Sequence, residues 1–153
     1  MNKAILKQAP LYDVDRLAWL ENQAALARAG RSGALDLENL AEELDVMVRS
    51  ERRELRNRLV VLLVHLLKHE FQPAMRSGSW RGSIVEQRRR IRDTIEESPS
   101  LRRWFADLAA DPAVYTDAVE QAAAETGLPP NAFPQICPYG AESIMDPSFW
   151  PGA

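Results

Sequence analysis

Apolar residues near the start of the chain recur every three or four positions, which is the spacing of one helix face. The positions are Val14, Leu17, Leu20, Ala24 and Ala27. Asp13 is a residue that favours a helix N-terminus, and Gly30 is a residue at which helices commonly end. The pattern therefore predicts a first helix from about residue 13 to Ala29.

A longer apolar stripe follows. Asp36 is a suitable cap, and only Glu51 interrupts the stripe before Pro73 prevents the helix from continuing. A helix over residues 37–71 would be about 52 Å long, whereas a compact chain of this length has a radius of gyration of about 15 Å. We therefore expect the helix to bend, to break between residues 49 and 53, or to protrude, and a protruding helix would favour a dimer.

Three shorter helices are predicted after this segment. Residues 72–83 have the composition of a loop, and Ser83 with Glu86 matches a capping box at the start of a third helix. Two further starts pair a capping residue with a proline suited to the first helical position, at Ser98-Pro99 and at Asp111-Pro112. They predict a fourth helix and then a fifth, which ends at a glycine.

The last 26 residues differ in composition from the rest. They hold six of the ten prolines but also many large apolar side chains, which disordered tails rarely carry. We expect residues 128–153 to form an ordered, largely irregular strap with one helical turn near residues 141–145. No strand pattern or internal repeat is visible. The predicted fold class is all-α, with a bundle of about five helices over residues 13–127 and the strap packed on it in a single domain.

The composition is that of a folded protein, and 153 residues suffice for one domain with its own core. The single cysteine, Cys137, excludes an internal disulfide and suits a reducing compartment. Its expected role is that of a small, buried apolar side chain. The longest apolar run, residues 59–67, is too short to cross a bilayer, and the first ten residues show no secretory signal. We expect a cytoplasmic protein without a membrane segment.

Charge is distributed unevenly along the chain. Residues 49–92 hold twelve Lys or Arg against four Glu, a balance of +8, and the remaining residues have a balance of −11. Most of the positive charge is arginine, which favours planar anionic partners. The overall net charge of −3 hides this asymmetry.

Motifs throughout the chain resemble one known family. They are Tyr12-Asp13, Trp19, Gln23-Ala24, Leu35-Asp36, Asn39-Leu40, Glu42-Glu43, Ser50 to Arg53, His65 to Lys68, Gln72-Pro73, Arg76, Ser79-Trp80, Ile84, Arg88, Ile91, Ser98 to Leu101, Glu125 to Leu128, Phe133-Pro134 and Cys137 to Tyr139. In this order they are similar to the bacterial domain-of-unknown-function family numbered twenty-nine. The resemblance implies a helical bundle and no known activity. Members of that family commonly have Trp where His69 stands.

The first candidate site lies between the long helix and the next one. Its residues are Arg76, Ser79, Trp80, Arg81 and Arg88. Arginine offers forked donors for a phosphate or carboxylate, tryptophan offers a stacking face, and a helix N-terminus attracts anions. The alternative is structural, with Trp80 covering the end of the bundle and the arginines paired to acidic residues of the same chain.

Two other candidates carry weaker signals. His65 and His69 lie four residues apart, so they could hold a metal with carboxylates such as Glu42 or Glu43, although His65 among leucines is also typical of a buried, hydrogen-bonded histidine. The arginines of residues 49–58 could contact a nucleic-acid backbone, but acidic residues are interleaved and the sequence pI is about 5.5.

These observations favour a non-enzymatic helical domain that binds a protein or a small anionic ligand and forms a homodimer. No cofactor is predicted, because no recognised cofactor motif occurs in the sequence. A metal-assisted enzyme that uses His65 with carboxylates is the alternative, and nucleic-acid binding through residues 49–58 is the third hypothesis. Which partner binds, and what reaction if any is catalysed, are left open by the sequence.

Overall fold

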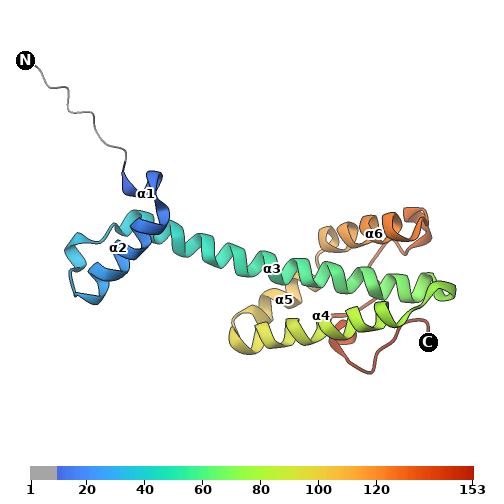
Figure 1. Cartoon of the computed structure of the whole chain (residues 1–153). Helices are drawn as coiled ribbons and strands as arrows, with labels where there is room; N and C mark the ends of the chain where they lie inside the picture. Colours follow the sequence, from blue (N-terminus) through green and yellow to red (C-terminus); the bar gives the residue numbers. More distant parts are fainter. Residues whose placement is uncertain (1–9) are drawn as a thin grey trace, which may run out of the picture. The chain divides into compact units, whose positions relative to one another are not determined.

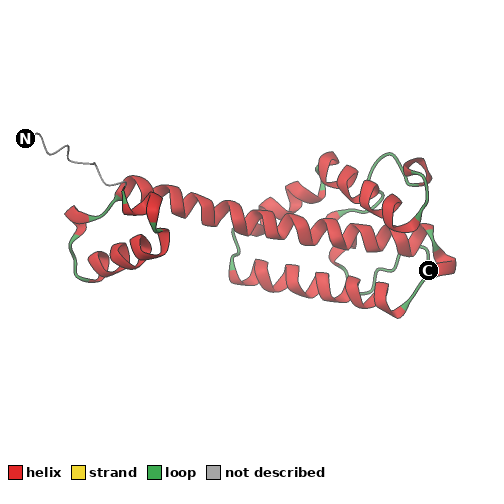
Figure 2. Cartoon of the chain, turned by 45° about the horizontal axis from the view of Figure 1, so that its top comes forward, coloured by secondary structure: helices red, strands yellow, loops and turns green. Residues whose placement is uncertain are grey.

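The computed structural model describes residues 10–153, which form helices and no strand (Figure 1, Figure 2). The α-helices are α1 (Leu11–Val14), α2 (Arg16–Arg28), α3 (Leu37–Phe71), α4 (Gly78–Glu97), α5 (Leu101–Ala109), α6 (Pro112–Thr126) and α7 (Ala141–Met145). Short 3₁₀ turns lie at Ser32–Ala34, Pro73–Met75 and Pro130–Ala132. The predicted all-α class is confirmed. None of the helices formed by residues 10–153 has the length and apolarity that crossing a membrane requires.

The chain divides into two compact units, residues 1–49 and residues 50–153. In the first unit, α2 is attached to the beginning of α3 by polar contacts. The Trp19 indole N–H donates to an Asp36 carboxylate oxygen at 3.2 Å, and the Asp36 backbone N–H donates to the Gln23 amide oxygen at 2.8 Å. Trp19 and Gln23 are the two buried side chains of α2. This unit therefore has a small and partly polar core.

The predicted cap of the first helix was wrong by two residues. Asp13 lies inside α1, and the chain leaves helical geometry at Asp15, with φ −145° and ψ 88°. The Asp15 carboxylate then accepts the Ala18 backbone N–H at 3.0 Å and caps α2. Aspartate competes with the helix for backbone donors, so a second aspartate two residues on divides one predicted helix into two.

The long helix forms as predicted, from Leu37 to Phe71. An Asp36 carboxylate oxygen accepts the Asn39 backbone N–H at 3.3 Å, and this bond confirms the predicted cap. The helix does not break between residues 49 and 53, so that one of the three expected outcomes is excluded.

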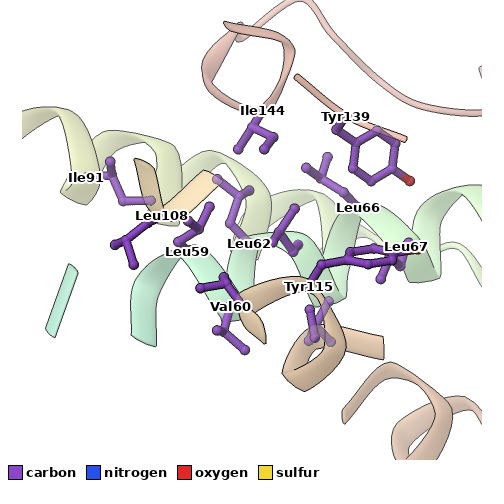
Figure 3. Packing of buried hydrophobic residues seen from close by; sticks show 14 of the residues in the cluster. Leu59, Val60, Leu62, Leu66, Leu67, Ile91, Leu108, Tyr115, Tyr139 and Ile144 are labelled. Atoms are coloured by element: carbon purple, nitrogen blue, oxygen red, sulfur yellow. The ribbon is translucent and has the colours of Figure 1, made fainter. Parts of the chain in front are cut away.

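The core of the second unit is built around the C-terminal half of α3. Leu55, Leu59, Leu62 and Leu66 are wholly inaccessible to solvent. Figure 3 shows Leu59, Leu62 and Leu66 packed with side chains from α4, α5, α6 and the C-terminal strap; the labelled partners are Ile91, Leu108, Tyr115, Tyr139 and Ile144. The C-terminal half of α3 is therefore buried on most of its sides by the other helices and the strap of this unit.

The predicted loop over residues 72–83 was wrong in its second half. Helix α4 begins at Gly78, where the Ser77 hydroxyl oxygen accepts the Trp80 backbone N–H at 3.3 Å. Ser83 therefore lies one turn inside the helix, and Glu86 pairs with arginines instead of closing a capping box. The two glycines of this segment suggested a loop. Ser77 is a capping residue that precedes Ser83, so the helix can start at Ser77.

The later predicted boundaries agree more closely with the structure. Helix α6 is capped by the Asp111 carboxylate, has proline at its first position and ends at Gly127 in the left-handed region with φ 73°, as predicted. Helix α5 starts at Leu101, two residues after the predicted proline start, because Ser98 and Pro99 form a turn. The strap over residues 128–153 is largely irregular and contains the predicted helical turn as α7.

Candidate anion-binding pocket

A pocket of about 510 Å³ lies at the N-terminus of α4, within the second unit. Its lining comes from the end of α3, the start of α4 and the last residues of the strap: His69, Arg76, Ser77, Gly78, Arg81, Trp150 and Ala153. Three of the seven lining residues carry basic side chains, and no acidic residue of the described chain lines it. This composition favours an anionic ligand.

The backbone at the start of α4 adds to this preference. The first N–H groups of any α-helix lack intrahelical acceptors, and the helix dipole places partial positive charge there. The Ser77 hydroxyl accepts one of these donors, from Trp80. Gly78 follows it with no side chain to shield the first turn, and a Cβ at this position would meet no atom within 4 Å. A ligand could therefore approach the backbone closely.

Arg76 is held in place by the strap. Its Nε–H donates to the His69 carbonyl oxygen at 2.7 Å and an Nη2–H donates to the Gly152 carbonyl oxygen at 2.7 Å. Gly152 has φ +71°, and a Cβ there would lie 2.8 Å from the Arg76 Nη2 atom. Only glycine allows the strap to pass so close to the guanidinium. Two backbone carbonyl oxygens thus hold one side of the Arg76 guanidinium in place.

Arg81 is an exposed cation of the pocket. Its guanidinium carbon lies 4.6 Å from the ring centroid of Trp150, a cation–π contact that orients the planar group. No residue of the described chain forms a hydrogen bond or ion pair with the Arg81 side chain. The donors of Arg81 are therefore available to a ligand.

His69 closes the inner side of the pocket. Its side chain is buried, its Nδ1 atom lies 2.7 Å from the Pro151 carbonyl oxygen, and its ring centroid lies 5.7 Å from that of Trp150. Because a carbonyl oxygen can only accept, the Nδ1 atom carries the hydrogen. His69 therefore holds the strap and Trp150 against the end of α3.

The other candidate residues of this segment lie elsewhere. Ser79 is exposed and does not line the pocket. The Trp80 ring lies under the Lys68 ammonium, with 4.6 Å between Nζ and the ring centroid. The structure thus brings Arg76 and Arg81 together and separates Ser79 and Trp80 from them. The aromatic partner of the site is Trp150, which sequence reasoning did not select because it is far away along the chain.

Arg88 lies inside the molecule and binds the strap. It is 2% exposed, and its Nε–H and Nη2–H groups donate to the carbonyl oxygens of Ile144 at 2.7 Å and Phe149 at 2.9 Å. Burial lowers the pKa of Arg88, whereas the negative charge of Asp146 raises it. These contacts support a structural role for Arg88 in holding residues 144–149.

The predicted metal pair is engaged in backbone hydrogen bonds at both histidines. The His65 Nδ1 atom lies 2.8 Å from the Val61 carbonyl oxygen of the preceding turn, and His69 is bonded to the strap. Within residues 10–153 no three His, Cys, Asp or Glu side chains are grouped closely enough to hold a metal ion. The metal hypothesis receives no support from this geometry and stays a prediction.

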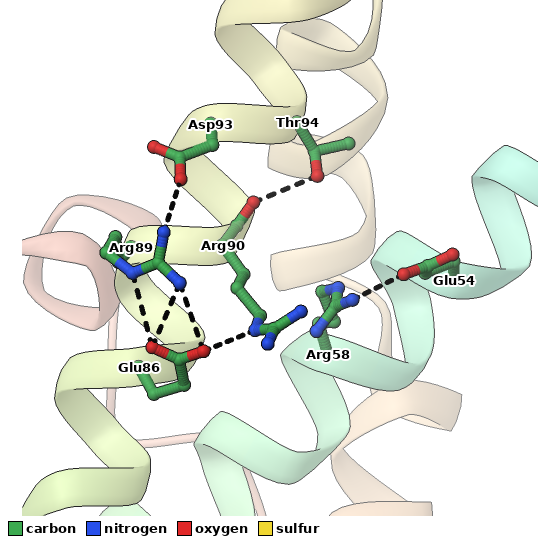
Figure 4. Close-up of polar contacts among 7 residues, drawn as sticks. All are labelled: Glu54, Arg58, Glu86, Arg89, Arg90, Asp93 and Thr94. Atoms are coloured by element: carbon green, nitrogen blue, oxygen red, sulfur yellow. Dashed lines mark hydrogen bonds and ion pairs between the residues drawn. The ribbon is translucent and has the colours of Figure 1, made fainter.

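Several arginines of the predicted nucleic-acid surface are paired with acidic side chains. Arg49 is 2.9 Å from Glu42, Arg56 is 2.5 Å from Asp117, and Arg58 pairs with a glutamate one turn earlier. Figure 4 shows the last pair beside a second network on α4, where Glu86 binds Arg89 and Arg90. These two arginines lower the pKa of Glu86. The pairing reduces the positive charge that a phosphate backbone would meet.

A second pocket, of about 460 Å³, lies between the α5–α6 junction and the strap. It contains Cys137, whose thiol is half-buried and 3.5 Å from the Tyr139 carbonyl oxygen. Burial raises the pKa of Cys137 and raises the pKa of Tyr115 to about 12. Both groups are therefore held neutral, and the thiolate that a nucleophilic cysteine requires is disfavoured.

The comparison with known proteins gives a family without an assigned activity. Neither a curated protein nor a solved structure is detectably similar to this sequence. The family described as "Domain of unknown function DUF29" matches residues 11–150, nearly the whole chain, as the resemblance in the sequence predicted. The chain belongs to this family of uncharacterised function.

Proposed function

We propose that the chain is a non-enzymatic binding domain whose pocket at the start of α4 takes an anionic group, a carboxylate or phosphate, of a small molecule or a protein partner. The observation that supports this most directly is Arg81, an exposed guanidinium oriented by Trp150 in a pocket lined by no acidic residue of the described chain. The first-turn backbone N–H groups of α4 add donors on the same side.

The proposal assigns no catalytic residue. The Cys137 thiol and the Tyr115 hydroxyl are the reactive groups nearest to a second pocket, and burial raises the pKa of each. A cytoplasmic location is part of the proposal, and a free cysteine supports it because reducing compartments preserve thiols. A homodimer is its second part, supported by nine large apolar side chains that stay exposed in residues 11–48.

Binding is tested by titrating the protein with inorganic phosphate and with citrate while following tryptophan fluorescence, with glycerol as the uncharged control. Both anions should perturb the spectrum with saturation, since Trp150 lies in the pocket. An Arg81→Gln variant should weaken the affinity by about tenfold, the loss expected for one charge-assisted hydrogen bond.

The matched control is Arg102→Gln, which removes another exposed arginine, from α5 and outside the pocket. It should bind both anions as the unaltered protein does. If both variants weakened the affinity for the anions equally, the effect would come from the change in net charge and not from the pocket. Saturable binding that survives Arg81→Gln would contradict the assignment of the pocket. A response to citrate but not to phosphate would identify a carboxylate as the group recognised.

A further inference from the structure

The first unit exposes an unusual amount of apolar surface for its size. Nine of the twelve exposed large apolar side chains of the described residues belong to it: Leu11, Val14, Leu17, Leu20, Leu37, Leu44, Val46, Met47 and Val48. Among residues 10–49, Trp19 and Gln23 are the only buried side chains. A unit of this size rarely holds itself together without help from a metal, a disulfide or an oligomer. Its helices therefore need an apolar surface to cover them.

The exposed residues of α3 form a stripe. Leu37, Leu44 and Met47 are exposed and Leu40 between them is half-buried; the four recur in steps of three and four residues, the spacing of a helix–helix seam, and the exposed Val48 adjoins them. Leu37 and Leu44 are 68% and 61% exposed. The contacts of α3 with α2 and α1 come instead from Asp36 and Glu43, about a quarter of a turn away around the helix. The stripe is therefore left uncovered by the first unit itself.

Helix α2 carries a matching stripe. Leu17 and Leu20 are exposed, and their side of α2 lies on average about a third of a turn from Trp19 and Gln23, the side chains that face α3. The two helices run antiparallel, because Arg16 near the start of α2 pairs with Glu43, whereas Gln23 further along pairs with Asp36. On each helix the stripe lies on the same side of the contact face when the helix is viewed from its own N-terminus. Because the two helices are antiparallel, this places both stripes on one side of the pair. The hairpin thus presents a single apolar face.

We propose that this face is where a second copy of the chain docks, so that two α2–α3 hairpins form a four-helix bundle. This inference deepens the homodimer part of the proposed function and does not depend on the anion pocket. An antiparallel helix pair with one apolar face is half of such a bundle. A twofold rotation axis would pack this face against the same face of the second copy.

The charges around the stripe agree with an apolar, self-complementary partner. Glu42 lies on the opposite side of α3 from the stripe, and Glu38 and Asp45 lie about a third of a turn from its centre. Glu43, which borders the stripe, is already engaged by Arg16 and by the Tyr12 hydroxyl at 2.7 Å. Residues 10–49 hold eight acidic residues against four arginines, so an anionic lipid surface would repel them.

The size of the face is sufficient for a dimer. The eight exposed apolar residues of the two stripes and of α1 expose on the order of 400 Å² of apolar area, taking about 60–120 Å² for a fully accessible side chain. A standard interface buries about 800 Å² per partner, and somewhat more than half of that is apolar. The two areas are of the same magnitude.

The test is the mass of the full-length protein in solution, measured by light scattering after size-exclusion chromatography over a wide range of concentrations. The unaltered chain should have twice its monomer mass of 17.2 kDa. The double variant Leu44→Glu with Val48→Glu places four carboxylates in the interface, and the dimer should dissociate at least about 100-fold more readily. Glutamate is a good helix former, so α3 itself should persist.

The matched control is Val85→Glu, which introduces one carboxylate per chain at a valine that is 57% exposed on α4 of the second unit. This variant should remain dimeric. Circular dichroism checks that each variant keeps its helices, and a pair of alanine substitutions at residues 44 and 48 replaces the glutamates if it does not.

The outcomes separate the two levels of the proposal. A monomeric unaltered protein at every concentration overturns both the homodimer and this face as its interface, without affecting the anion pocket. A dimer that the variants at residues 44 and 48 leave intact overturns the face alone. A dimer lost equally in Val85→Glu also overturns it, since the interface would then lie on the second unit.

Discussion

Leu44 and Leu62 stand eighteen residues apart on α3, which is five full turns of an α-helix, so helical geometry gives them the same face. Leu62 is 0% exposed and Leu44 is 61% exposed. Around Leu62 the second unit supplies α4, α5, α6 and the strap, whereas in the first unit α2 contacts the start of α3 mainly through the hydrogen bonds that join Trp19 and Gln23 to Asp36. Two leucines on one face of one helix thus contribute differently to the stability of the fold, because only one of them is surrounded by other side chains.

This contrast separates two ways of ordering a helix. The second unit is stabilised mainly by the burial of apolar side chains, and its polar contacts attach the strap to this apolar core. The first unit is held by caps and polar bridges around Asp36, which contribute about 1 kcal/mol each. Burial of apolar side chains stabilises a fold more than a few such bridges do, so the first unit should be the first to open. Four substitutions test this difference between the units.

Arg88→Met should have the largest effect, a loss of about 3–5 kcal/mol in the unfolding free energy of the second unit. It removes the donors that satisfy the Ile144 and Phe149 carbonyl oxygens in a buried site. Urea denaturation followed by circular dichroism measures it. Arg89→Met, one residue on and exposed, should change stability by less than about 1 kcal/mol; similar losses in both would contradict the structural role of Arg88.

Leu62→Ala should cost about 2–5 kcal/mol in the same unfolding transition, because it leaves a cavity in a fully buried site. Leu44→Ala, at the equivalent position five turns earlier, should move that transition by no more than about 0.5 kcal/mol. Equal costs would show that the two ends of α3 unfold as one unit, and the contrast between Leu44 and Leu62 would have no energetic meaning.

Asp36→Ala should destabilise the first unit by about 1–2 kcal/mol, since it removes a helix cap and the acceptor of the Trp19 indole N–H. Amide hydrogen exchange of residues 11–48 should accelerate accordingly. The comparison is Asp111→Ala, which removes only the cap of α6 and should accelerate exchange there by a smaller factor. No change in residues 11–48 would mean that some other contact orders α2.

Glu125→Gln should have the smallest effect, and a pH-dependent one. The hydrogen bond from Lys68 lowers the pKa of Glu125 below its ordinary value of 4.5. The stabilisation is therefore present above pH 4.5 and is lost as the pH falls through the lowered pKa. Since the Glu125 side chain is 36% exposed, solvent screens the pair and the difference should be below about 1 kcal/mol. Thermal unfolding at neutral and acidic pH measures it, with Glu120→Gln as the control that should show no such difference.

The helices themselves could be predicted from local signals. Asp36, Asp111-Pro112 and Gly127 mark boundaries through hydrogen bonds and backbone angles that involve only neighbouring residues, and the structure has them where the sequence places them. The errors arose where two local signals compete, as with Asp13 and Asp15, or where glycines conceal a cap, as at Ser77. In each case the chain used a capping residue that the sequence also contains.

The candidate site could be predicted only in part. Arg76 and Arg81 lie close together along the sequence, and the helix start between them is a local feature, so the sequence pointed to both. Trp150 could not be found in this way, because it reaches the pocket only through the path of the strap. Arg88 was assigned to the site for its charge, and only its burial under residues 144–149 shows that it serves the strap instead.

The all-α class, the long helix and the apolar stripe along it follow from the sequence without further information, because helix formation depends on periodicity and on contacts a few residues apart. Only the packing of the folded chain settles which end of that stripe is buried, which arginines are free, and which tryptophan stands beside them. Those properties depend on contacts between residues that are far apart in the sequence. The local pattern of apolar and polar residues does not determine such contacts.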